Sequence, residues 1–208
     1  MTPGASGTGV TPSTTDGSFT RHVFVTGATG FVGSAVVKEL LAHGHGVSGL
    51  VRSDVSAEAL ARTGARVIRG SLEDLESLRQ GATAADATIH TAFNHDFSRF
   101  AENCELDRRA IETLGDALQG TKKPFVVTSG LGHMQPGHLA TEDAPSLPVS
   151  PAYPRASEAT AEAVASRGVH AMVVRLPFTV HDAGDHGFIA VLVNIAREKG
   201  FSAYPGDG

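Results

Sequence analysis

The chain has 208 residues, which suits one domain, and its 41% hydrophobic content is enough for a buried core. Its net charge of −5 and the lack of a basic block make nucleic acid a poor partner, and no apolar run approaches the roughly 18 residues of a membrane span. The single cysteine, Cys104, excludes a disulfide within the chain and suits a reducing compartment, so we expect a cytoplasmic location.

The first residues differ in composition from the rest. Residues 1–20 are mostly Thr, Ser, Gly and Pro, without the apolar segment of a secretory signal. Such a composition buries too little apolar surface to fold. We therefore interpret 1–20 as a disordered leader and expect the ordered domain at 21–208.

From residue 21 onward, short β-branched runs alternate with amphipathic segments. In chain order we expect a strand at 23–26, a helix at 33–42, a strand at 47–51, a helix at 56–62, a strand at 66–69, a helix at 72–80, a strand at 88–91, a helix at 99–118, a strand at 125–128, a helix at 156–166 and a strand at 171–176. Strands that are apolar on both faces and alternate with helices belong to a parallel sheet covered on both sides. The sequence therefore predicts an α/β fold with a doubly wound, mostly parallel sheet, the Rossmann fold.

Three glycines follow the first expected strand in the stretch TGATGFVG. Gly27 permits a tight turn, Gly30 lets the backbone approach a pyrophosphate, and Gly33 lets the helix pack close to the strand. The N–H groups at the start of the helix and its dipole then favour a phosphate. The residues that would surround this phosphate are Gly27, Thr29, Gly30, Phe31, Val32 and Gly33.

This turn and three later motifs, ATIHTAF at 87–93, VVTSG at 126–130 and VVRLP at 173–177, carry a family resemblance. From residue 21 to its last residue the chain resembles the extended and atypical short-chain dehydrogenase/reductases, in the NAD-dependent epimerase/dehydratase group. The resemblance implies that the first of the three motifs passes under the ribose of the cofactor, that the second carries a catalytic serine, and that the third approaches the nicotinamide. The corresponding residues are Thr91, Ala92, Phe93, Ser129 and Pro177.

The choice of dinucleotide depends on the residues just past the second strand. Arg52 stands where an Asp or Glu would bind the ribose 2′-hydroxyl of NAD, and an arginine there pairs with the 2′-phosphate of NADP. Ser53 adds a hydroxyl donor. Asp54 is also within reach of the 2′-hydroxyl, so NAD stays an alternative. We favour NADP(H).

The adenine site departs from the family pattern. The family usually has an Asp after the third strand that binds the adenine amino group, and this chain has Ser71 there. Serine can accept a hydrogen bond but carries no charge. Leu72 is expected to cover the adenine. We expect a weakened but present adenine site.

The proton-transfer residues also depart from the family. The resemblance implies that a tyrosine exchanges a proton with the substrate oxygen, that Ser129 hydrogen-bonds the same oxygen, and that a lysine four residues after the tyrosine holds the nicotinamide ribose. Tyr153 is present, but Ser157 stands in place of the lysine. We regard Arg155 as a poor substitute, because two residues along a helix is a rotation of about 200°. The sequence thus shows no replacement for the lysine.

Without a cation beside it, a tyrosine has a pKa of about 10 and is a poor base at neutral pH, although it can still donate a proton. Carbonyl reduction is therefore easier to support than alcohol oxidation. The three histidines His95, His133 and His138 lie in loops on the expected ligand side, and one of them is an alternative acid. The histidines show no metal-ligand spacing, so we predict no metal.

Three functions remain open. The first is an NADP(H)-dependent reductase of a carbonyl on a small organic substrate. The second is a non-catalytic NADP-binding regulator or scaffold, suggested by Ser71, by the missing lysine and by the apparent truncation of the C-terminal substrate lobe after a strand expected to begin at 201–204. The third is a nucleotide-sugar epimerase or dehydratase, which would need the Tyr-Lys pair. We also expect a homodimer through the helices at 99–118 and 156–166.

Overall fold

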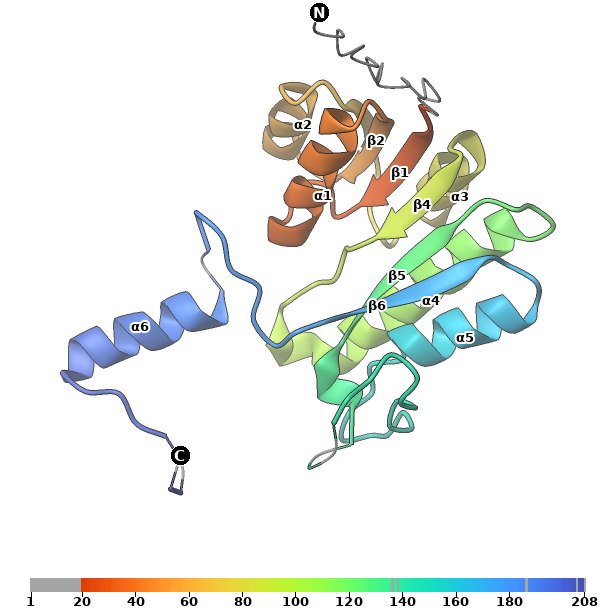
Figure 1. Ribbon diagram of the computed structural model, residues 1–208. Helices are drawn as coiled ribbons and strands as arrows, with labels where there is room; N and C mark the ends of the chain where they lie inside the picture. The colour runs from red at the N-terminus through yellow and green to blue at the C-terminus, as the bar shows by residue number, and fades with distance from the viewer. Residues whose placement is uncertain (1–19, 136, 138, 186, 205, 208) are drawn as a thin grey trace, which may run out of the picture.

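The computed structural model describes residues 20–135, 137, 139–185, 187–204 and 206–207. Six parallel strands form one sheet in the order β3-β2-β1-β4-β5-β6 (Figure 1). The strands are β1 (His22–Thr26), β2 (Gly46–Val51), β3 (Arg66–Arg69), β4 (Ala87–His90), β5 (Phe125–Gly130) and β6 (Ala171–Leu176). All six expected strands are present, and the parallel sheet is confirmed.

Helices alternate with the strands along the chain. They are α1 (Phe31–Ala42), α2 (Asp54–Ala61), α3 (Leu75–Ala84), α4 (Phe100–Leu118), α5 (Ser157–Ser166) and α6 (Phe188–Lys199), with short 3₁₀ turns η1 (Phe97–Arg99) and η2 (Leu131–His133). In Figure 1, α1 and α2 lie on one face of the sheet, while α3, α4 and α5 lie on the other. The fold is therefore the doubly wound α/β fold that the sequence predicts.

The core has two parts because β1 points its side chains alternately to the two faces. Phe24 packs into the larger cluster, with residues of α3, α4 and α5 such as Leu78 and Ile111. Val23 and Val25 pack into the smaller cluster against α1 and α2. This alternation follows the two-residue period of a strand and explains why the strand is apolar on both faces.

The strand order places the ligand side of the sheet. The chain winds outward from β1 to β2 and β3, then returns to β4 on the other side of β1. In such sheets, ligands bind at the carboxyl ends of the strands at this switch point. The glycine turn follows β1, and the segment from Thr91 follows β4, with Thr26 and His90 in register. Two groups of residues predicted to bind the cofactor, the glycine turn and the segment from Thr91, therefore flank the switch point.

The C-terminal part differs from the expectation. Residues 188–199 form α6, which the sequence reading did not predict, and it ends at Gly200 with a left-handed φ of 78°. Residues 201–204 are an exposed segment without strand pairing, so the strand expected to begin there is wrong. The reason is that a strand needs a neighbouring strand, and α6 lies apart from the sheet in Figure 1. No residue of α6 is buried in the part of the chain that the structure describes.

The expected leader at 1–20 lies outside the described residues except for Thr20, which is exposed. Among the described helices, none has the length and apolar character that crossing a membrane would require.

Candidate functional site

Two of the three glycines are required by the fold itself. Gly27 has a φ of 70°, and a Cβ there would lie 2.8 Å from the backbone nitrogen of Ala92. A Cβ on Gly33 would lie 2.0 Å from the carbonyl oxygen of Gly27. Both distances are far inside van der Waals contact, so the turn, α1 and the segment after β4 pack this closely only with glycine at these positions.

Gly30 is different. A Cβ there would meet only the carbonyl oxygen of Gly27, at 3.2 Å, and Gly30 and its neighbour Thr29 are exposed. Gly30 is also the N-cap of α1 and supplies no side-chain cap to the helix. The N-terminus of a helix attracts anions, and an exposed glycine at the cap leaves room for one. This geometry fits the phosphate role predicted for Gly30.

Beyond β2, the three residues considered for the ribose have different surroundings. Arg52 is exposed, and it makes no hydrogen bond or ion pair within the described part of the chain. Ser53 caps α2: it accepts a hydrogen bond from the backbone of Ser56 at 3.2 Å and donates to its hydroxyl at 3.0 Å. Asp54 pairs with Arg69 at 2.5 Å. Of the three, Arg52 has the side chain most available for an anionic ligand.

The predicted adenine residues are partly engaged elsewhere. The hydroxyl oxygen of Ser71 accepts hydrogen bonds from the backbone of Glu73 at 3.2 Å and of Asp74 at 3.3 Å. A hydrogen bond from Ser71 also lowers the pKa of Glu73 below its ordinary value. Leu72 is half-buried against the larger core cluster. Ser71 therefore shapes the turn before α3, which limits its capacity to bind a ligand.

The segment after β4 lies directly against the glycine turn. The Thr91 hydroxyl donates to the carbonyl of Thr26 at 2.8 Å, and the Ala92 N–H donates to the Thr26 hydroxyl at 3.4 Å. The next residue, Phe93, points its ring toward Phe100, with 6.2 Å between ring centroids. This segment thus joins the glycine turn to the aromatic residues that follow.

Aromatic side chains form a continuous cluster next to Tyr153. Phe93 contacts His95 at 5.4 Å between centroids, His95 contacts Phe97 at 6.1 Å, Phe97 contacts Phe100 at 5.9 Å, and Phe100 contacts Tyr153 at 5.9 Å. These residues come from the loop after β4, from η1, from the start of α4 and from the loop before α5. They give Tyr153 an apolar wall suited to an apolar substrate.

Tyr153 does not lie on a helix. It forms an isolated bridge with Ser150, in which each backbone N–H donates to the other residue's carbonyl, at 3.0 and 3.2 Å. Helix α5 begins only at Ser157. Residues 154–156 therefore join Tyr153 to α5 without belonging to the helix, because the bridge and Pro154 keep the chain out of a helical conformation there.

The Tyr153 hydroxyl lies beside the turn that follows β5. A Cβ on Gly132 would lie 3.2 Å from the Tyr153 hydroxyl and 3.4 Å from the ring of Phe178. Phe178 follows Pro177, an exposed residue just past β6. The segments after β5 and β6 and the loop before α5 therefore meet at one place, near the carboxyl edge of the sheet.

Ser129, near the end of β5, is buried, and its hydroxyl has no hydrogen-bond partner among the described residues. A buried hydroxyl without a partner costs about 1–3 kcal/mol, so such groups need an explanation. Ser129 lies three positions before Gly132, against which the Tyr153 hydroxyl packs. A substrate oxygen bound at this point would satisfy the serine.

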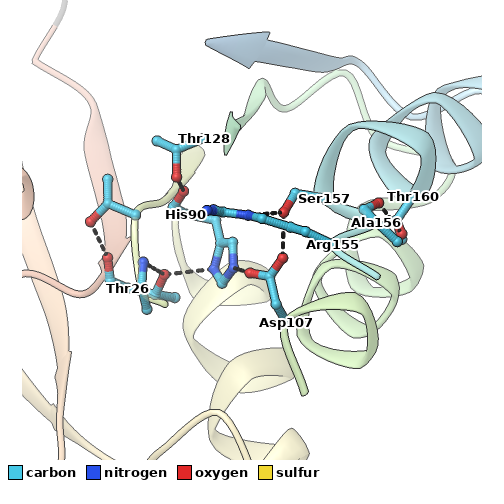
Figure 2. A network of polar contacts seen from close by, with 10 residues as sticks. Thr26, His90, Asp107, Thr128, Arg155, Ala156, Ser157 and Thr160 are labelled. Carbon is cyan, nitrogen blue, oxygen red and sulfur yellow. Dashed lines mark hydrogen bonds and ion pairs between the residues drawn. The ribbon is translucent and has the colours of Figure 1, made fainter. Parts of the chain in front are cut away.

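A buried chain of polar side chains, which the sequence reading missed, runs from the end of β1 to the start of α5 (Figure 2). The Thr26 hydroxyl is 2.7 Å from Nδ1 of His90, and Nε2 of His90 is 3.0 Å from Oδ1 of Asp107. The Ser157 hydroxyl donates to Oδ2 of Asp107 at 2.6 Å, and Nε of Arg155 donates to the Ser157 hydroxyl at 3.0 Å. The only hint in the sequence was that these polar residues stand at positions whose spacing along the chain is that of buried apolar residues.

Arg155 is the last residue of this polar network and lies next to the aromatic cluster. Its guanidinium carbon lies 4.2 Å from the centroid of the Phe93 ring. The rejection of Arg155 as a substitute for the lysine was based on helical rotation, and that argument fails because Arg155 precedes the helix. The structure does provide a cation in this region.

The alternative proton donors are less well supported. Burial, and then the positive charge of Arg155, hold the pKa of His95 below its ordinary value of 6.5, so His95 is mostly neutral near pH 7. A neutral histidine is a weaker acid for this role. The side chain of His133 and the whole of His138 lie outside the described residues.

Comparison with known proteins gives the family. A family model described as NAD(P)H-binding matches residues 27–200. The chain is 47% identical over 188 residues to the Schizosaccharomyces pombe protein C2A9.02, covering 90% of this chain and 63% of that one. It is 31% identical over 192 residues to a 4-hydroxy-2-methyl-3-oxo-4-farnesyl-3,4-dihydroquinoline-1-oxide ketoreductase from Stigmatella aurantiaca, covering 86% of this chain and 56% of the ketoreductase.

The fold has solved counterparts. The Bordetella bronchiseptica enzyme WbmH, whose crystal structure is in complex with NAD⁺, superposes with a TM-score of 0.70 at 20% identity, covering 88% of this chain and 64% of WbmH. The chain thus spans about three fifths of the length of these proteins. The chain belongs to the NAD(P)H-binding family, and its parallel six-stranded sheet is a Rossmann domain.

Proposed function

We propose that the protein is an NADP(H)-dependent reductase that reduces a carbonyl group on a small, apolar organic substrate. The observation that carries this proposal is the convergence of two sites at one edge of the sheet. The N-terminus of α1, with the exposed Gly30 as its cap residue, follows β1, and Tyr153 meets the turn after Ser129 at the end of β5. The family membership supports the nicotinamide cofactor.

The residues fit a dinucleotide phosphate. Gly30 leaves space where a side chain would fill the phosphate position, and the dipole of α1 favours an anion at its N-terminus. Arg52 supports NADP(H) over NAD(H), because its exposed guanidinium suits the 2′-phosphate while Asp54 is paired with Arg69. Binding of NAD(H) through Asp54 would require that pair to open.

The site residues have separate tasks in reduction. NADPH, when bound, supplies a hydride to the carbonyl carbon. The Tyr153 hydroxyl donates its proton to the carbonyl oxygen as charge develops there, and the Ser129 hydroxyl donates a hydrogen bond to the same oxygen. The aromatic cluster from Phe93 to Phe100 excludes water and contacts the apolar part of the substrate.

A non-catalytic NADP-binding module is the second candidate. The observation that favours it is Ser157, which stands in the lysine position and donates its hydroxyl to Asp107 rather than to the site. The phosphate site and the proton-transfer site are formed by different residues, so cofactor binding can exist without turnover.

Two measurements on the 208-residue chain test the proposal. Isothermal titration calorimetry should show NADPH binding more tightly than NADH, and the nicotinamide absorbance should fall when apolar ketones and aldehydes are added. Binding without any absorbance change across such a panel would favour the non-catalytic module. Absence of NADPH and NADH binding would contradict both candidates.

A further inference from the structure

The strand order fixes which half of a bound dinucleotide lies near Arg155. If the pyrophosphate lies at Gly30 after β1 and the 2′-phosphate lies at Arg52 after β2, the adenine half extends toward β2. The nicotinamide half must then extend the other way, toward the ends of β4 and β5. Arg155 lies on that side, because its guanidinium covers Phe93, three residues past β4.

The guanidinium of Arg155 has N–H groups that make no hydrogen bond within the described part of the chain. Of its five N–H groups, the one on Nε is bound to Ser157, at 3.0 Å. No carboxylate in the described part of the chain pairs directly with Arg155, unlike Arg175, which pairs with Glu158 on α5. The fork of Nη groups is therefore available for the oxygen atoms of a ligand.

The buried network that begins at Ser157 holds the Arg155 side chain in place. Ser157, Asp107 and His90 are each about 1% exposed. Asp107 accepts hydrogen bonds from Ser157 and His90 on separate oxygens, and His90 is fixed in turn by Thr26. A buried and fully bonded carboxylate is rigid, and its negative charge attracts the guanidinium one hydroxyl away.

Ser157 then has a structural meaning beyond the loss of a lysine. A lysine at this position would have a methylene group where the Ser157 hydroxyl now lies, 2.6 Å from Asp107, so the hydrogen bonds from Arg155 and to Asp107 would be lost. The short serine side chain instead bridges Asp107 to Arg155 and leaves the cation to come from the extended segment before α5. Two positions that look unrelated in the sequence therefore act together.

We propose that Arg155 takes the place of the family's lysine and binds the ribose of the nicotinamide half of the cofactor, with Ser157 and Asp107 as its positioning residues. This inference rests on the proposed function, since it assumes that a dinucleotide binds at the glycine turn. It assigns the cofactor contact to a residue type and a position that the family pattern does not contain.

The electric field of Arg155 provides a readout that is independent of the ligand. The guanidinium charge helps to hold down the pKa of His95, after the larger effect of burial. Removing the charge in Arg155→Met should raise the pKa of His95, measured by proton NMR titration with His95→Gln to assign the signal. An unchanged pKa would contradict the placement of the guanidinium in this region.

The ligand test compares two probes by calorimetry on the whole chain. NADP⁺ has both halves of the cofactor, while 2′,5′-ADP has only the adenine half. Arg155→Met should weaken NADP⁺ binding by about 10- to 100-fold, the range of a hydrogen bond to a charged group, and leave 2′,5′-ADP binding unchanged. Arg155→Lys should recover part of the loss. Ser157→Ala should weaken NADP⁺ to a smaller extent, because Arg155 loses its anchor.

The two probes also separate the possible failures. If wild-type chain binds neither NADP⁺ nor 2′,5′-ADP, the proposed function is contradicted, and this inference with it. If wild type binds both probes and Arg155→Met binds both equally well, only this inference is contradicted. A loss of both probes in an Arg155→Met variant that keeps the wild-type circular dichroism spectrum would also overturn it, because a contact to the nicotinamide ribose alone cannot weaken 2′,5′-ADP. Retained 2′,5′-ADP binding shows in each variant that the domain is folded.

Discussion

The glycine turn after β1 and the segment around Tyr153 are built in different ways. The turn is made by residues 26–33, and its shape is fixed by close backbone contacts, such as the 2.0 Å that would separate a Cβ on Gly33 from the Gly27 carbonyl. The Tyr153 region is assembled from segments far apart in the sequence: Tyr153 contacts Phe100 at the start of α4 and the turn after β5. Nearby, the buried polar chain that ends at Arg155 joins β1, β4, α4 and α5. A local motif therefore describes the first region, whereas the second depends on the whole fold.

The largest expected effect comes from valine substitutions at two glycines of the turn, one of which should impair folding and the other cofactor binding. Gly33→Val should destabilise the protein by more than about 4 kcal/mol, because the added carbon meets backbone that cannot move away. Gly30→Val should lose far less stability than Gly33→Val, since its Cβ meets only one atom, at 3.2 Å, yet it should lose NADPH binding. Urea unfolding and calorimetry measure the two effects. Retained NADPH affinity in Gly30→Val would contradict the phosphate site.

The next effect concerns the polar chain of the second region. Asp107→Ala removes the acceptor of both Ser157 and His90, and two buried donors without an acceptor should cost about 3 kcal/mol of unfolding free energy. The matched control is Asp116→Ala on the same helix, which breaks an exposed pair with Arg167 and should cost at most about 1 kcal/mol. Equal losses of stability in the two variants would show that the buried polar network contributes no more to the unfolding free energy than an exposed ion pair does.

Cofactor choice gives a smaller effect. Arg52→Ala should weaken NADPH by about 1.5–3 kcal/mol, the scale of a charge-assisted hydrogen bond, and leave NADH nearly unchanged. The matched control is Arg62→Ala, which removes a cation at the other end of α2 and should change neither affinity. Equal losses for NADPH and NADH in Arg52→Ala would indicate that this arginine does not face the 2′-phosphate.

The smallest effect is the pH dependence that His95 contributes. Its pKa in the folded protein is below the ordinary value of 6.5, so the unfolded chain binds the proton more readily. Stability from this group is therefore present above about pH 6.5 and falls as the pH drops toward the folded pKa. His95→Gln should lose less stability than wild type over this acidic window in thermal unfolding. A steeper loss in His95→Gln would show that the sign is wrong.

The sequence was sufficient to predict the elements whose conformation is determined by residues that are close together in the chain. The six strands have apolar, β-branched residues next to turn residues, and each strand was predicted close to its observed bounds. The glycine turn was predicted because its spacing and its flanking strand and helix are consecutive in the chain. Helix α6 was missed because an apolar run without buried contacts is ambiguous between helix and strand.

The sequence did not predict the contacts that depend on the tertiary fold. Nothing in the spacing of Thr26, His90, Asp107 and Ser157 indicates that they touch, because they lie on four different elements. Arg155 was rejected because its position was judged on a helix that in fact begins two residues later. Side-chain networks of this kind depend on register and packing, which a motif does not encode.

A crystal structure of the chain with NADP⁺ would test the account most directly. We predict that the pyrophosphate lies against the start of α1 at Gly30, that the 2′-phosphate lies on Arg52, and that the nicotinamide ribose lies on the side of β4 and β5 within reach of Arg155. NADP⁺ bound away from the glycine turn, or bound there with the adenine on the Arg155 side, would contradict the account.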